Sequence, residues 1–168
     1  RPMRAVAQKK PRVWWCAAVV LASTARGACL LERELGGVAF EAARAGLLAG
    51  ALYEANGFKQ LALRQVSPRA FVADYVHPRG GPTREHCVVR VDGPGRLVID
   101  VTATSPRAPF GALFETRVEI TLLRMTSAPP VLRCASRVAW TSSRRRLGFI
   151  AARVEGGAAR GVGAGVQP

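Results

Sequence analysis

Residues 97–123 read LVIDVTATSPRAPFGALFETRVEITLL and contain two alternating segments on either side of a turn. After Gly111, apolar side chains recur at every second position, with charged and polar side chains between them. Because successive side chains of a strand point to opposite faces, this period of two predicts a half-buried strand. Residues 97–103 alternate in the same way. The prolines and glycine within 105–111 cannot continue a ladder, so the sequence predicts two antiparallel strands joined by a turn.

Three further segments, residues 69–76, 86–91 and 131–140, carry the same strand pattern. The Asp-Gly-Pro-Gly at 92–95 predicts a tight hairpin, and the Ser-Ala-Pro-Pro at 127–130 predicts another turn. Together these segments predict a five-strand antiparallel meander.

Helical periodicity flanks the predicted sheet. Within residues 38–55 the apolar side chains share one helical face, and Gly57 is a plausible stop. The spacing of Leu147, Ile150 and Val154 predicts a second helix directly after the last strand, which Gly156-Gly157 would end early. We therefore expect an α+β fold, in which a curved antiparallel sheet wraps a C-terminal helix and an N-terminal helix precedes the sheet. Residues 58–66 are ambiguous and could be an extended lead into the sheet.

The two ends of the chain lack these patterns. Residues 1–12 are basic and aperiodic, and the apolar run at 13–22 is only half the roughly 20 residues that span a bilayer. Three interpretations of this run stay open: a secretory signal or anchor, a buried or frayed helix, or an artefactual leader. Residues 1–37 are therefore expected to be a poorly ordered leader or a separate helix, and residues 161–168 a flexible tail.

The chain is strongly basic, with 25 Lys and Arg against 11 Asp and Glu in 168 residues and a formal net charge of +14. Such a charge favours an anionic partner, such as a membrane surface or a nucleic acid, although arginine-biased coding would give the same composition. Arg117, Arg133 and Arg137 fall on predicted strands, but the aromatic residues fall on the apolar faces. Stacking platforms for nucleic acid need both on one face, so no nucleic-acid partner is expected.

Catalytic and metal-binding patterns are not recognisable. The four cysteines form no CxxC pair, which gives no zinc site and favours reduced thiols. His77 lies in a predicted loop, and His86 and Cys87 point to opposite faces of a strand, so the last two cannot act as a base and nucleophile pair. The glycines form no phosphate-binding motif. We expect no enzyme activity, no metal and no cofactor.

Several short motifs together resemble a known family. Pro109, Phe110 and Gly111, followed by Phe114, are similar to a conserved segment of the VASt domain of the Aster and Lam sterol-transfer proteins, which are relatives of the StAR lipid-transfer domains. Further similarities are Tyr75 with Pro78 and Gly81-Pro82, and Val138, Trp140 and Gly148-Phe149-Ile150 near the C-terminus. The resemblance covers residues 38–160.

The resemblance implies a helix-grip, START-like fold that binds a lipid, with a sterol favoured, and transfers it between membranes. It also implies a place at the cytosolic face of membranes, such as endoplasmic reticulum contact sites. A membrane-associated interaction scaffold and a basic nucleic-acid-binding module are the alternatives. The closing helix and the loop are shorter than is usual in the family.

The resemblance also places the site. The lid would be the loop of His77, Pro78, Arg79, Gly80, Gly81, Pro82 and Thr83, and Arg144, Arg145 and Arg146 would contact anionic lipid headgroups. The side chains expected to line the lipid cavity are Phe71, Tyr75, Leu97, Ile99, Val101, Phe114, Val118, Ile120, Leu122, Val138, Trp140, Leu147, Ile150 and Val154.

Overall fold

The computed structural model describes residues 20–24, 28–56, 58–77, 81–108, 110–141, 148, 150–152 and 154. In chain order the elements are β1 (Val20–Thr24), β2 (Ala28–Glu34), α1 (Phe40–Leu48), α2 (Ala51–Ala55), β3 (Lys59–Ser67), β4 (Ala70–His77), β5 (Gly81–Asp92), β6 (Arg96–Thr104), the 3-10 turn η1 (Gly111–Leu113), β7 (Phe114–Leu123) and β8 (Val131–Trp140).

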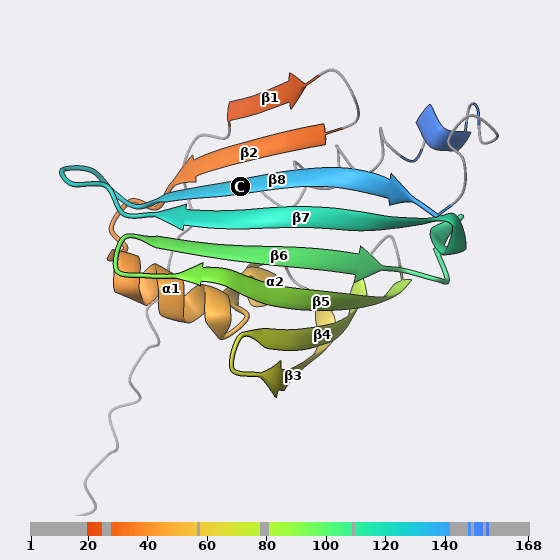
Figure 1. The fold of residues 1–168 in the computed structure, drawn as a ribbon, viewed down its shortest axis with the longest axis horizontal. Coiled ribbons are helices and arrows are strands. Elements are labelled where there is room, and N and C mark those ends of the chain that lie inside the picture. Colours follow the sequence, from red (N-terminus) through yellow and green to blue (C-terminus); the bar gives the residue numbers. More distant parts are fainter. Residues whose placement is uncertain are drawn as a thin grey trace, which may run out of the picture.

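The strands form one antiparallel sheet in the order β1-β2-β8-β7-β6-β5-β4-β3 (Figure 1). Strands β3 to β8 are a meander in which each strand pairs with the next one along the chain. Strand β2 pairs instead with β8, the last strand. The chain between β2 and β3 therefore crosses from one side of the meander to the other, and it carries α1 and α2 as it does so.

The five predicted strands correspond to β4 to β8, so the expected antiparallel meander is confirmed. The register pairs Leu97 with Leu122, Ile99 with Ile120 and Val101 with Val118, which places both alternating sets on one face. Strand β5 is longer than expected, because it begins at Gly81 rather than at residue 86.

The inner face of the sheet packs against α1. Phe40, Ala43 and Leu47 of this helix are buried against the apolar side chains of β4 to β8. The other buried members of this core are Leu35, Phe71, Cys87, Val89, Leu97, Ile99, Val101, Leu122 and Leu132. The apolar face of the meander is thus covered by α1, a helix that precedes the meander in the chain.

The outer face carries a lattice of ion pairs between neighbouring strands. Asp100 and Glu119 lie opposite each other in the register, and Arg90 binds both carboxylates, with its Nε 2.7 Å from Asp100 Oδ2. Arg84 pairs with Asp74 in the same way at 2.7 Å. These exposed pairs each contribute little to stability, and each one pairs an arginine of this face with a carboxylate.

Two expectations for the N-terminal half are corrected, and one open point is resolved. Residues 1–37 are not simply a leader, because Ala28–Glu34 form β2 inside the sheet. The single helix expected over 38–55 is two helices, since Gly50 adopts a left-handed φ of 85° between them. The ambiguous segment is the edge strand β3, which pairs with β4 through two register shifts.

The helix expected after β8 falls mostly on residues outside the described part of the chain, as does the tail from 161. The described positions 148, 150–152 and 154 are helical, and Ala151 is buried.

The turn between β6 and β7 depends on a glycine. A Cβ built on Gly111 would lie 1.9 Å from the Ser105 carbonyl oxygen, an atom of the backbone itself. Ser105 O also accepts the Ala108 amide at 2.9 Å, which holds that carbonyl in place. Only a residue without a Cβ fits this close approach.

We predict that Gly111→Ala lowers the free energy of unfolding by about 2–3 kcal/mol, because the new methyl group forces the turn open. Gly95→Ala is the control, since its Cβ would meet no atom within 4 Å. Urea unfolding of both variants measures the difference, and equal stabilities would contradict this account of the turn.

A second prediction concerns β2. Leu31 lies opposite Cys134 of β8 and is buried, so Leu31→Ala should cost about 2–3 kcal/mol. Leu63→Ala on the exposed edge strand should cost under about 1 kcal/mol. If Leu31→Ala left thermal unfolding unchanged, residues 28–34 would not belong to the folded unit.

Candidate functional site

A cavity of about 130 Å³ lies between the two helices and the inner face of the sheet. Strands β4 to β7 supply one wall, and α1, α2 and the segment after α2 supply the other. Its lining is Leu47, Leu52, Tyr53, Asn56, Phe58, Phe71, Glu85, Cys87, Ile99, Val101, Val118 and Ile120. Most of the lining is apolar, and the polar groups come from only four residues.

The break between the helices decides which side chains of α2 line the cavity. Gly50 caps α2 in the left-handed region, and α2 therefore does not continue the periodicity of α1. Tyr53 is buried as a result and reaches the sheet, where its ring lies 5.4 Å from that of Tyr75. Phe58 stacks on Tyr75 at 4.5 Å, so three aromatic rings gather at this end of the cavity.

Glu85 of β5 is the centre of the polar end. The Tyr53 hydroxyl donates to its Oε2 and the Tyr75 hydroxyl donates to its Oε1, both at 2.6 Å. The Tyr53 hydroxyl also lies 3.5 Å from the Cys87 Sγ. Two short hydrogen bonds from different elements fix the carboxyl group against the cavity wall.

The low-dielectric surroundings shift the pKa values of these groups. Burial raises the pKa of the Glu85 carboxyl, while the hydrogen bonds from Tyr53 and Tyr75 act in the opposite direction. Burial, followed by the nearby Glu85 charge, raises the pKa of both tyrosines far above its ordinary value. Burial raises the pKa of the Cys87 thiol to about 12. Burial therefore favours the protonated form of all four groups.

Among the described carboxylates that are not fully exposed to water, Glu85 is the one that makes no ion pair. Ion pairs with arginine are made by seven acidic residues: Glu32, Glu41, Asp74, Asp92, Asp100, Glu115 and Glu119. Glu34 and Glu54 are exposed to water. Within the described ranges, Glu85 has tyrosine donors but no Lys, Arg or His charge acting on it.

The expected cavity residues divide into three groups. Phe71, Ile99, Val101, Val118 and Ile120 line the cavity. Leu97 and Leu122 are buried in the core. Tyr75 is not itself among the described lining residues, but its hydroxyl donates to Glu85, which is. Of the rest, Phe114 and Trp140 pack together at 5.5 Å, and Val138, Ile150 and Val154 are half-buried and are not among the described lining residues. Leu147 lies outside the described residues.

Sequence reasoning placed Tyr75 in the cavity but missed Glu85, Tyr53 and Cys87 of the polar end. A usable signal was present in β5, because Thr83, Glu85, Cys87 and Val89 alternate and place one carboxylate on an otherwise apolar face. Tyr53 was not predictable in this way, since its orientation depends on the left-handed Gly50.

The expected lid is also corrected. Gly81, Pro82 and Thr83 belong to β5 and pair with His77, Val76 and Tyr75 of β4, so they are strand and not loop. Pro78, Arg79 and Gly80 lie outside the described residues, as do Pro109 of the motif and the three arginines at 144–146. Phe110 is exposed, with a left-handed φ of 64°, and Gly111 serves the turn.

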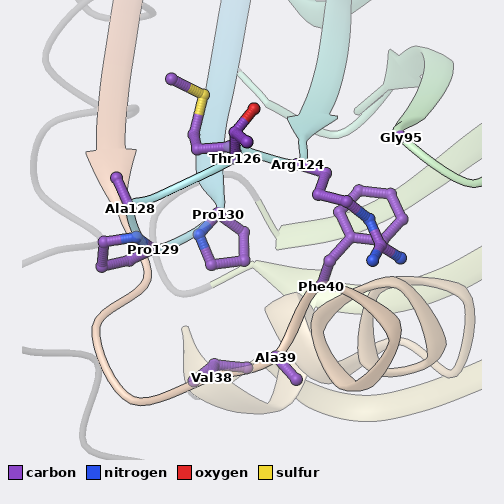
Figure 2. A pocket seen from close by; sticks show the side chains of 10 residues that line it. Val38, Ala39, Phe40, Gly95, Arg124, Thr126, Ala128, Pro129 and Pro130 are labelled. Atoms are coloured by element: carbon purple, nitrogen blue, oxygen red, sulfur yellow. The ribbon is translucent and has the colours of Figure 1, made fainter.

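A second hollow lies between the β2–α1 connection and the β7–β8 turn, with a volume of about 590 Å³ (Figure 2). It is an open groove lined by Val38, Ala39, Phe40, Gly95, Arg124, Met125, Thr126, Ala128, Pro129 and Pro130. The Arg124 guanidinium stacks over the Phe40 ring at 4.7 Å and binds Glu41 Oε1 at 2.5 Å. The charge of this groove is thus already satisfied by the protein, which makes it the weaker candidate.

Comparison with known proteins gives no family. No protein-family model matches the chain, and no curated protein matches it. Among solved structures, a Rhodobacter sphaeroides protein is similar, with 18% identity and a TM-score of 0.48 over 85% of this chain and 93% of its own. A conserved protein from Geobacillus kaustophilus has 16% identity and a TM-score of 0.45 over 74% and 83%. Likenesses at this level assign no function.

Two further observations concern only the described part of the chain. None of its helices is long and apolar enough to cross a membrane. It also contains no group of three or more His, Cys, Asp and Glu side chains placed to hold a metal ion.

The raised pKa of Glu85 predicts a pH-dependent stability. The folded state holds this proton more tightly than the unfolded chain, so the stabilisation is complete below the unfolded glutamate pKa and is lost as pH rises through the folded value. As the pH rises above the unfolded glutamate pKa of about 4.3, the wild type should lose stability relative to Glu85→Gln in urea unfolding. Glu54→Gln, on the exposed side of α2, should show no such trend. A wild type that gained stability relative to Glu85→Gln over this range would contradict the burial of the carboxyl group.

Proposed function

We propose that this protein binds a small, mainly apolar molecule in the cavity between α1–α2 and the sheet. The observation that carries the proposal is the cavity itself, with eight apolar side chains in its lining. Protein interiors normally pack as densely as organic crystals, so an unfilled space of about 130 Å³ among apolar side chains is a site for a guest.

The volume limits the ligand. An apolar cavity of roughly 150 Å³ is known to bind benzene, so about six non-hydrogen atoms fit here without rearrangement. Ligands of this size bind through burial of apolar surface, and we expect a Kd of about 0.1–1 mM for a simple hydrocarbon.

The lining favours binding over covalent chemistry. Its one thiol, Cys87, has a pKa raised by burial to about 12, which keeps it as the weakly nucleophilic neutral form. The lining contains no serine, histidine or lysine. We propose a non-enzymatic binding protein.

We further propose that the fold is a helix-grip fold closed by a helix after β8. The position of α1 and α2 between β2 and β3, and the helical positions near residue 150, support this. Sterol transfer at an anionic membrane surface stays a prediction. Sites for ligands of that size measure about 300–1,000 Å³, so a sterol would require α1 and α2 to move away from the sheet.

The test is a titration of the full chain with benzene, followed by NMR chemical shifts. We expect saturable shifts at Val101, Val118 and Ile120 and a raised melting temperature, because the ligand binds only the folded state. Val118→Phe should fill the cavity and abolish both effects. Val88→Phe, at an exposed position of the outer face, is the control and should bind like the wild type.

A parallel titration with a fluorescent sterol separates the alternatives. Benzene binding without sterol uptake supports the small-ligand proposal, and sterol uptake that Val118→Phe abolishes would support the larger, opened cavity. Absence of binding in both titrations would overturn the proposed function.

A further inference from the structure

We propose that the ligand is a small alkyl amine whose ammonium group pairs with Glu85. This inference rests on the proposed function and names the chemical class of the molecule that fills the cavity. Its basis is the geometry of the polar end, where a carboxyl group on the cavity wall has tyrosine donors but no cation.

The basic composition of the chain makes the lack of an ion pair at Glu85 informative. The sequence contains 25 Lys and Arg residues, and seven of the described carboxylates form ion pairs with arginine. Glu85, which lines the cavity, has none in the described part of the chain. A carboxylate in an apolar site is stabilised strongly by an opposite charge, so the missing cation is best supplied by the ligand.

The hydrogen bonds leave Glu85 able to receive that cation. Each carboxylate oxygen accepts one tyrosine hydroxyl at 2.6 Å, and each has a second lone pair. An ammonium group carries only donors, so it complements a carboxylate that both tyrosines already orient.

The aromatic rings in the lining would also favour an ammonium group. Tyr53 and Phe58 line the cavity beside Glu85, and Phe71 lines it from β4. Cations are attracted to aromatic faces, and the effect grows when the site excludes water. The lining also includes Leu47, Val118 and Ile120, apolar side chains that would take the hydrocarbon part of the amine.

The groups around Glu85 define its pH response. Tyr53 faces it from α2, Tyr75 from β4 and Cys87 from its own strand, all of them neutral, and β6 places Ala103 opposite it in the register. Glu85 must ionise before it pairs with an ammonium group. Amine affinity should therefore increase as the pH rises through the pKa of Glu85, up to the point where the amine itself loses its proton near pH ~10.

The test compares two probes of equal size, cyclopentylamine and cyclopentanol, by calorimetric titration of the full chain at about pH 8. We expect the amine to bind at least about tenfold more tightly, with release of a proton by any Glu85 that is still protonated before the amine binds. Glu85→Gln should remove the amine preference, so that the amine and cyclopentanol bind this variant with equal affinity. Glu54→Gln should behave as the wild type with both probes.

The outcomes separate this inference from the proposed function. If cyclopentanol binds as tightly as the amine, or Glu85→Gln keeps the amine preference, the amine inference is wrong and the apolar binding site stands. If neither probe binds the wild type, both proposals fail together.

Discussion

The cross-strand register of β6 and β7 is the constraint on which the rest of the structure depends. It places Leu97, Ile99 and Val101 beside Leu122, Ile120 and Val118, and so makes one continuous apolar face at the centre of the sheet. A slip by one residue would turn all of these side chains toward the charged lattice of the outer face. The turn at Gly111 and the ion pairs of Arg90 with Asp100 and Glu119 both hold this register.

The same face explains the cavity and its polar end. Helix α1 covers one part of the face through Phe40, Ala43 and Leu47, and the kink at Gly50 directs Tyr53 toward β5. A cavity remains between the two helices and the sheet, and Glu85 is the one carboxylate among its described lining residues. Two tyrosines from separate elements hold Glu85, so the polar end is a built feature of the fold and not a chance surface contact.

The period of two in the sequence predicted the strands that have one solvent-exposed face and one apolar face. Strands β4 to β8 and the shared face of Ile99, Val118 and Ile120 follow from alternation alone. It failed where pairing partners are distant in sequence, since β2 is defined by β8, about a hundred residues away. It also failed at Gly50, because a left-handed glycine changes the helical face and no pattern in residues 38–55 reveals it. Glu85 could have been found, since it breaks the apolar alternation of β5.

The central claim is that a buried carboxyl group, held by two tyrosines, borders an apolar cavity. The most direct measurement is the NMR titration of the Glu85 side-chain carbon. The account predicts that Glu85 titrates above the ordinary glutamate pKa of about 4.3, because burial raises its pKa. A Glu85 pKa at or below that ordinary value would contradict the account, since the carboxylate would then already be stabilised by water or by a cation.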